Sequence, residues 1–183
     1  MIKRLDDIEQ ALRELRAGLV LAYPTEAVYG LGCDPFQPDA VARILALKNR
    51  PQDKGLILLI SKWSQLLPLI GDVPLARLDV IKKTWPGPVT WVFPKSATLP
   101  DYLCGSHDTI AVRMTAHPVA QQLCQNTPIV STSANPQGKE PARSLQALER
   151  FFPGGVDGVV MGALGTENQP SAIYDALTDE RLR

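Results

Sequence analysis

Leu56-Ile57-Leu58-Leu59-Ile60 gives the strongest strand signal in the chain, because a run of this kind is typical of a strand that is buried on both faces. A helix with apolar residues at positions 41, 44, 45 and 47 is expected before it, with Asp39 as its N-cap. This helix must end before Pro51, since proline disfavours helical geometry in the residue that precedes it. The connecting segment, Lys48-Asn49-Arg50-Pro51 with Lys54 close behind, therefore places three cations at the edge of a predicted sheet, where ligands of such sheets bind.

Strand and helix signals alternate along the rest of the chain. Apolar residues spaced three and four apart predict helices over residues 5–17, 63–70, 74–84, 117–125 and 145–152. Short apolar runs predict strands over residues 19–23, 89–93, 109–113, 128–130, 158–162 and 172–176, and residues 24–32 are expected to form a loop. The interleaving indicates the α/β class, and a mixed sheet is expected because three of the strands lack a crossover helix.

Composition narrows the class of protein. The 183 residues fit one domain, residues 1–183, with 45% hydrophobic residues and 19 basic against 19 acidic side chains. This balance argues against general nucleic-acid binding, which usually leaves an excess of basic residues. Cys33, Cys104 and Cys124 lack the spacing of a zinc site, so free thiols in a cytoplasmic protein are expected. No signal peptide and no 18-residue apolar span is visible, which predicts that the protein does not enter a membrane.

The cations of the first polar segment have two interpretations. Lys48, Arg50 and Lys54 could be a solvated helix end, where positive charge complements the helix dipole. They could also bind phosphate, because arginine offers a rigid fork of donors and lysine a mobile point charge. The residues alone leave both open.

The second polar segment is Ser131-Thr132-Ser133-Ala134-Asn135, which follows the strand predicted at residues 128–130. It could be a polar turn, or a set of neutral groups that position a ligand. A nucleophilic serine needs a base, and neither His107 nor His117 lies in a recognisable triad motif. We therefore expect ligand positioning without a nucleophile–base pair.

Single residues elsewhere suit the same role. Thr25 follows the strand at residues 19–23 and could present its hydroxyl to a ligand, while Glu26 could be a base, a metal ligand or a cap. Tyr29 could pack against a ligand or belong to the core. Arg113 ends an apolar strand, where its charge needs a partner such as a carboxylate. Neither a Walker-type loop nor a GxGxxG motif is present.

Six stretches in this order resemble the YrdC/TsaC family of threonylcarbamoyl-AMP synthases, in its single-domain bacterial form. They are PTEAVYGLGCDP, LKNRPQDKGLILLI, WPGPVTWVFP, AVRMTAHP, IVSTSANPQG and PSAIYDAL. The resemblance implies a twisted, open α/β sheet flanked by helices, with a positively charged concave cleft. It also implies a nucleotidyltransferase that condenses L-threonine, bicarbonate or CO2, and ATP into threonylcarbamoyl-AMP and pyrophosphate. The product would pass to a complex that modifies tRNA.

The resemblance implies roles for ten residues. Lys48, Arg50 and Lys54 would hold the ATP phosphates, and Ser133, Asn135 and Arg143 would also bind the nucleotide. Thr25, Tyr29, Thr132 and Arg113 would bind threonine, with Arg113 on its carboxylate. No residue is expected to act as nucleophile or base, and no protein metal site is expected, because Mg2+ would be carried on the triphosphate.

Two other functions remain open from the sequence. One is a double-stranded RNA-binding or ribosome-maturation module, whose affinity for RNA would fall steeply with salt. The other is a carbamoyl-handling domain like those of larger hydrogenase-maturation proteins. Direct RNA binding by a synthase also remains open.

Overall fold

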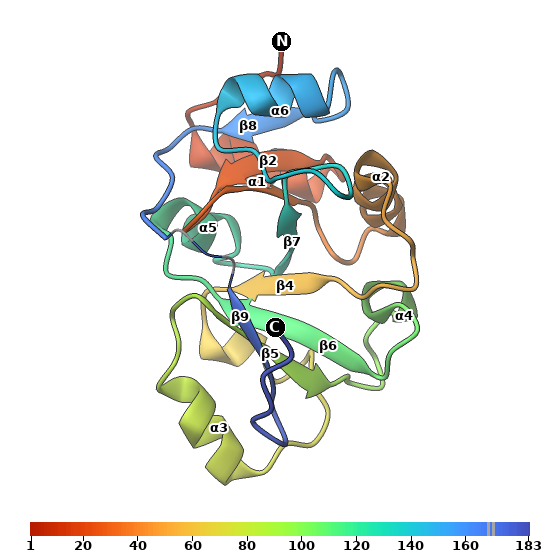
Figure 1. The fold of residues 1–183 in the computed structure, drawn as a ribbon, viewed down its shortest axis with the longest axis vertical. Coiled ribbons are helices and arrows are strands. Elements are labelled where there is room, and N and C mark those ends of the chain that lie inside the picture. The colour runs from red at the N-terminus through yellow and green to blue at the C-terminus, as the bar shows by residue number, and fades with distance from the viewer. Residues whose placement is uncertain (168, 170) are drawn as a thin grey trace.

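The computed structural model describes residues 1–167, 169 and 171–183, and the strands of this part of the chain form one nine-stranded sheet (Figure 1). The strands are β1 (Arg4–Leu5), β2 (Leu21–Pro24), β3 (Tyr29–Gly32), β4 (Ile57–Ile60), β5 (Val89–Pro94), β6 (Thr109–Met114), β7 (Ile129–Ser133), β8 (Gly158–Val160) and β9 (Ala172–Asp175). Their spatial order is β1-β8-β2-β3-β7-β4-β6-β5-β9. Parallel pairs such as β4/β6 and antiparallel pairs such as β4/β7 occur in the same sheet. The mixed α/β architecture expected from the sequence is confirmed.

Helices cover both faces and both ends of this sheet. They are α1 (Ile8–Arg16), α2 (Pro38–Lys48), α3 (Leu75–Lys82), α4 (Asp101–Cys104), α5 (Pro118–Leu123) and α6 (Leu145–Phe151), with a 3₁₀ helix, η1, at Trp63–Gln65. Figure 1 shows α6 at one end of the long axis and α3 at the other, with α2 and α4 along one side. The helices and the sheet enclose three clusters of buried apolar side chains.

Alternation along the strands decides which cluster each side chain joins. Leu21 and Tyr23 of β2 pack with α1 and α5, whereas Ala22 points to the other face and packs with α6. In β4, Leu59 belongs to the first of these clusters, and Leu58 and Ile60 belong to the large cluster that includes residues of α2 and α3. Because successive side chains of a strand point to opposite faces, an apolar run such as residues 56–60 is buried on both sides.

The strand β3 lies inside the segment predicted as a loop. Glycines at positions 30 and 32 hid it, because glycine is normally depleted in strands. A Cβ at Gly30 would lie 3.1 Å from the Tyr23 ring, and one at Gly32 would lie 2.8 Å from it. These glycines therefore let the tyrosine of the paired strand lie against the backbone of β3.

Four other element predictions were wrong in their bounds. The second helix begins after an N-cap at Gln37, not Asp39, because Pro38 occupies its first position, where proline needs no hydrogen-bond partner. Leu5 belongs to β1, where it pairs with Val160, and the helix begins at Ile8. Of residues 63–70, only η1 is helical. The polar turn considered at 131–133 is part of β7, and α4 was not predicted.

All three cysteines are free thiols in the core. Cys33, Cys104 and Cys124 are fully buried, and burial raises the pKa of Cys33 and of Cys124 to about 12. Among the described residues, no helix is long and apolar enough to cross a membrane.

Candidate functional site

A cavity of about 690 Å³ lies on one face of the sheet, between the β2–β3 turn, β7 and the C-terminal segment. Its floor is a row of directly paired residues from four strands: Ser131 of β7, Ile57 of β4, Ala111 of β6 and Val92 of β5. Ser131 and Ala111 have short side chains in this row. The sheet therefore stays uncovered here, while larger residues of the same strands fill the core on its other face.

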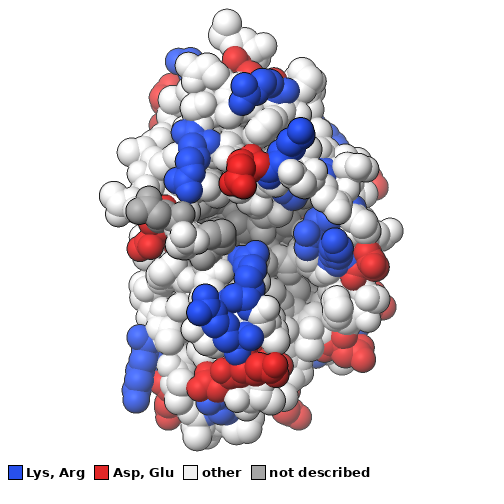
Figure 2. Space-filling model, viewed as in Figure 1, with Lys and Arg blue, Asp and Glu red and all other residues white. Residues whose placement is uncertain are grey.

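Charged side chains surround this cavity. The described residues that line it include four arginines and three glutamates: Arg50, Arg113, Arg143, Arg183, Glu26, Glu140 and Glu167. Figure 2 shows a hollow in the middle of this face with Lys and Arg side chains on opposite sides of it and acidic side chains among them. The site is therefore bipolar, and suits a ligand that carries charges of both signs.

The turn between β2 and β3 presents Glu26 to the cavity. Thr25 closes the turn, because its Oγ1 donates to the Val28 carbonyl at 2.7 Å and its backbone N–H donates to the same oxygen at 3.1 Å. These two hydrogen bonds to the Val28 carbonyl use the Thr25 hydroxyl proton inside the turn. The lone pairs of Thr25 Oγ1 remain able to accept a hydrogen bond. Thr25 and Tyr29 both line the cavity while being largely buried.

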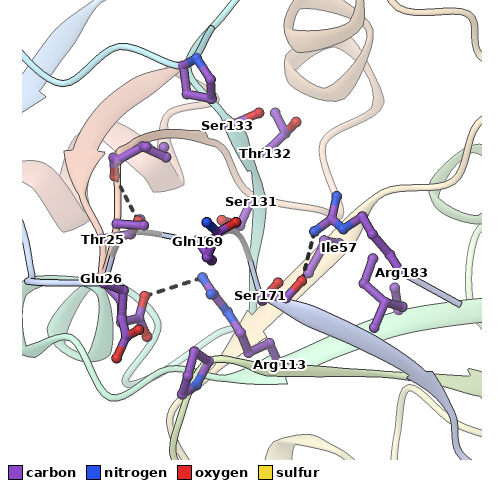
Figure 3. A pocket seen from close by; sticks show the side chains of 18 of the residues that line it. Thr25, Glu26, Ile57, Arg113, Ser131, Thr132, Ser133, Gln169, Ser171 and Arg183 are labelled. Carbon is purple, nitrogen blue, oxygen red and sulfur yellow. Dashed lines mark hydrogen bonds and ion pairs between the residues drawn. The ribbon is translucent and has the colours of Figure 1, made fainter. Parts of the chain in front are cut away.

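Glu26 and Arg113 form an ion pair at the base of the cavity. The Arg113 Nη2 atom lies 3.4 Å from Glu26 Oε2, and both side chains are about nine-tenths buried (Figure 3). Glu26 Oε1 accepts hydrogen bonds from Thr115 Oγ1 at 2.8 Å and from the Ala116 backbone N–H at 3.1 Å. Burial acts to raise the pKa of Glu26, but the Arg113 guanidinium and these hydrogen bonds outweigh it, so the pKa is lowered. Glu26 is therefore an ionised carboxylate at neutral pH.

Lys48 lies behind the cavity and not in its lining. It is the last residue of α2, which Asn49 ends in a left-handed conformation with a φ of 49°. The buried Nζ atom donates to the Ser133 carbonyl and, at 2.8 Å, to the Asn135 carbonyl. Burial and the neighbouring Arg50 lower the pKa of Lys48 to about 8. These contacts tie the end of α2 to the end of β7 and so hold the second polar segment in place.

The other two cations of the first segment differ from each other. Arg50 lines the cavity, is half-buried, and donates from Nη2 to the Gly55 carbonyl at 2.8 Å. Burial lowers the pKa of Arg50, and the nearby Asp53 carboxylate offsets part of this effect. Lys54 is exposed, takes part in a backbone bridge with Gly105, and is not among the described residues that line the cavity.

The second polar segment reaches the cavity through Ser131, Thr132 and Ser133, which Figure 3 places along one edge of the site. Ser131 is fixed from behind, because its Oγ accepts a 2.7 Å hydrogen bond from the buried Tyr23 hydroxyl. The amide nitrogen of Asn135 donates instead to the Pro136 and Lys139 carbonyls, which stabilises the turn that follows. Asn135 is not among the lining residues, and its assignment to the nucleotide stays a prediction, as do those of Lys48 and Lys54.

Arg143 and Arg183 complete the cations. Arg143 lines the cavity and donates from Nη1 to the Ala27 carbonyl at 3.0 Å. Arg183 was not predicted, because it belongs to a polar stretch without a motif; its Nη2 donates to the Ser171 carbonyl at 3.1 Å. Burial, followed by the nearby Arg113, lowers the pKa of Arg183. Ser131 was noticed in the sequence only as part of the second polar segment, and Glu26 only as a candidate base, metal ligand or cap, so neither was assigned to ATP or to threonine.

The side chains described in and around the cavity give little support for a metal ion bound by the protein itself. Among the described residues, no group of three or more histidine, cysteine, aspartate or glutamate side chains could hold a metal ion. A divalent cation at this cavity would have to keep most of its ligands from a bound phosphate group and from water.

Comparison with known proteins identifies the family of this chain. The Sua5/YciO/YrdC family model, described as "Telomere recombination", matches residues 13–183. A threonylcarbamoyl-AMP synthase of Pseudomonas putida is 49% identical over 177 residues, which are 96% of each chain.

Solved structures give the same relationship. The structure of P. abyssi Sua5 complexed with L-threonine superimposes with a TM-score of 0.88 at 35% identity, over 96% of this chain and 54% of that one. The chain thus spans about half of that longer protein. The crystal structure of E. coli YciO matches with a TM-score of 0.83 at 26% identity, over 100% of this chain and 92% of that one.

Proposed function

The chain belongs to the Sua5/YciO/YrdC family, and we propose on this basis that it is a threonylcarbamoyl-AMP synthase. Such a nucleotidyltransferase makes threonylcarbamoyl-AMP from L-threonine, ATP and a one-carbon substrate, which is either bicarbonate or CO2. The observation that carries the proposal is the cavity itself. It joins Arg50, Ser133 and Arg143 of the expected nucleotide site to Thr25, Thr132 and Arg113 of the expected threonine site. Both substrates could therefore meet over one floor.

The residues would act mainly by positioning. Arg113, buried at the base of the cavity, is placed for the threonine carboxylate, and Arg50 and Arg143 are placed for the anionic part of the nucleotide. The threonine nitrogen attacks the carbon of CO2, so that a C–N bond forms, one C=O π bond opens to give the carbamate oxygen anion, and the nitrogen loses a proton. Bicarbonate would enter this step as CO2, after it has lost hydroxide. A carbamate oxygen then attacks the α-phosphorus, so that an O–P bond forms and the bond to the pyrophosphate oxygen breaks. The arginines offset the charge that develops on the phosphate oxygens.

Mg2+ fits this scheme as a companion of ATP. When bound with ATP, it would supply positive charge beside the phosphates and so add to the neutralisation by Arg50 and Arg143. The protein side chains would then orient the substrates and exclude water around the reacting atoms. No described side chain needs to act as a covalent nucleophile. Of the described carboxylates that line the cavity, Glu26 is held in an ion pair with Arg113.

The partners of this reaction follow from its product. An acyl-adenylate of this kind is reactive, so we propose that it passes to a tRNA threonylcarbamoyl-transfer complex in the cytoplasm. Direct RNA binding by this chain is less favoured, because the cavity carries glutamates among its arginines and the whole chain has no net positive charge.

The test is a reaction of the pure protein with ATP, Mg2+ and bicarbonate, with and without L-threonine. We expect pyrophosphate release that depends on threonine, and a product with the mass of threonylcarbamoyl-AMP. ATP consumption that does not depend on threonine but increases with carbamoyl phosphate would indicate the carbamoyl-handling function instead. RNA affinity that falls with salt concentration and is unaffected by threonine, in a protein that does not turn over ATP, would indicate the RNA-binding module.

A further inference from the structure

The connection between α2 and β4, residues 49–56, carries Arg50 and lies against the turn that follows α4 (Figure 1). The Asp53 carbonyl of this connection accepts two hydrogen bonds from Ser106, at 3.0 Å from its N–H and at 3.3 Å from its Oγ. The next residue of the connection forms an antiparallel bridge with Gly105. The connection is therefore held from outside the cavity, since neither Gly105 nor Ser106 is among the described residues that line it.

The turn requires glycine at position 105. Its φ of 66° and ψ of −129° lie in a region that residues with a side chain rarely adopt. A Cβ at Gly105 would overlap the Asp53 carbonyl oxygen, and would lie 2.6 Å from the Asp53 carbonyl carbon and 3.0 Å from the Gly55 nitrogen. Favourable contacts between carbon atoms begin at about 3.5 Å, so a side chain here would displace the connection by about 1 Å.

The part of the connection that would move is the part that orients the Arg50 side chain. Arg50 Nη2 donates to the Gly55 carbonyl at 2.8 Å, whereas the Arg50 backbone stays with α2 because its N–H donates to the Leu45 carbonyl at 2.9 Å. Gly55 is also packed against the turn, since a Cβ there would lie 3.0 Å from the Cys104 carbonyl oxygen. The direction of the guanidinium group therefore depends, through Gly55, on the turn that follows α4.

We propose that Gly105 is a positioning residue for ATP, because the close packing of its backbone against residues 53–55 sets the direction of the Arg50 guanidinium. This inference rests on the proposed function, in which Arg50 binds the anionic part of the nucleotide. It adds a residue outside the cavity to those that determine the affinity for ATP.

The other half of the cavity is held independently of this turn. The strand β6 begins at Thr109 and pairs with β4 on one side and with β5 on the other, which fixes its register. Arg113 lies near the far end of this strand, opposite the end that follows the turn. A change confined to residues 104–106 is therefore expected to alter the affinity for ATP and to leave the affinity for L-threonine unchanged.

The experiment compares Gly105→Ala with Gly154→Ala by isothermal titration calorimetry, with ATP and Mg2+ and, separately, with L-threonine. Gly154 is the matched control, because its φ of 70° is also positive but a Cβ there would meet nothing within 4 Å. Gly105→Ala is expected to weaken ATP by about tenfold or more, the effect of losing one hydrogen bond to a charged group. Gly154→Ala is expected to change neither affinity. Wild-type affinity for ATP in Gly105→Ala, or an equal loss for ATP and L-threonine, would overturn the proposal.

A double-mutant cycle shows whether Gly105 acts through Arg50. Arg50→Ala alone gives the full effect of losing this side chain. If Gly105 acts by directing the guanidinium, the double variant should bind ATP no more weakly than Arg50→Ala. A further loss as large as the one that Gly105→Ala causes in the wild-type background would overturn the proposal, because the two residues would then act independently.

Gly55→Ala tests the same packing from its other side if Gly105→Ala does not fold. Its φ lies outside the left-handed region, and its Cβ would press on the Cys104 carbonyl oxygen. This variant should also weaken ATP and spare L-threonine, and wild-type affinity for ATP would overturn the proposal. A wild-type protein that neither binds ATP nor releases pyrophosphate with threonine would overturn the proposed function as well. A protein that makes the product, but in which Gly105→Ala and Gly154→Ala behave alike, would overturn the positioning role alone.

Discussion

Replacing Lys48 with methionine separates two roles for this residue, a support for β7 and a ligand of phosphate. Methionine keeps most of the aliphatic stem and has a similar helix propensity, so the substitution removes chiefly the ammonium group. The structure places that ammonium against the Ser133 and Asn135 carbonyls and outside the cavity lining. We therefore expect the first effect of Lys48→Met to be a loss of stability.

The magnitude follows from the contacts. Hydrogen bonds from a charged donor contribute about 1.5–3 kcal/mol each, and two buried carbonyls lose such a donor, so we expect the free energy of unfolding to fall by about 2–4 kcal/mol. For a chain of this length, such a loss lowers Tm by roughly 4–16 °C. The two bonds together would contribute about 3–6 kcal/mol. Burial of the ammonium group, which lowers the pKa of Lys48 to about 8, costs free energy that the substitution recovers, so the expected net loss is smaller than this sum.

The assay is urea unfolding at neutral pH, together with ATP binding by calorimetry. Lys54→Met is the matched control, because it makes the same change at an exposed lysine of the same segment and should alter the free energy of unfolding by less than about 0.5 kcal/mol. If Lys48→Met kept the wild-type unfolding midpoint while it lost affinity for ATP, the supporting role would be refuted and the phosphate-binding role restored.

Three further predictions concern the cavity. Arg50→Ala should lower threonine-dependent pyrophosphate release by about tenfold or more, whereas the free energy of unfolding should fall by no more than about 1.5–3 kcal/mol, since one hydrogen bond from a charged donor to Gly55 is lost. Equal turnover in Arg50→Ala and in the exposed control Arg4→Ala would contradict this. Thr115→Val removes a donor to Glu26 Oε1, and should raise KM for threonine more than KM for ATP, as steady-state kinetics would measure; an equal rise in both would speak against it. The pKa of Glu26 is lower in the folded than in the unfolded chain, so its contribution to stability is present above the unfolded value and is lost as the pH falls through the folded one. Acid titration of unfolding should accordingly show a smaller loss in Glu26→Gln than in wild type, and parallel curves would refute the assignment.

Much of the sheet was predictable because its strands are apolar and bounded by turn residues. Residues 56–60 were recognised as a strand because an uninterrupted apolar run is typical of a strand buried on both faces. In the structure, their side chains belong to two separate clusters of buried apolar residues. The strand β3 was not predictable, since its glycines are explained by contacts that exist only in the folded chain, chiefly with the Tyr23 ring of the neighbouring strand and, at Gly32, with the Val130 carbonyl. Local propensity cannot reveal a contact of this kind.

The candidate site was predictable in its residue types more than in its contacts. Arg50, Arg113 and Ser133 line one cavity, and the roles toward ATP and threonine that the resemblance implied for them stay predictions. Lys48 could not be distinguished from Arg50 in the sequence, although one is buried against carbonyls and the other faces the cavity. The ion pair of Arg113 with Glu26 joins residues that are far apart in the chain, and depends on a turn whose geometry has no sequence motif.

The three buried thiols give this protein an internal set of reporters. An alkylating reagent reacts with an exposed thiolate, and Cys33, Cys104 and Cys124 are neither exposed nor ionised in the folded chain. Each can therefore be labelled only when the structure around it opens, at the end of β3, in α4 and at the end of α5 respectively. Labelling followed residue by residue by mass spectrometry would map which part of the sheet opens first, and would show how far bound substrates slow that opening.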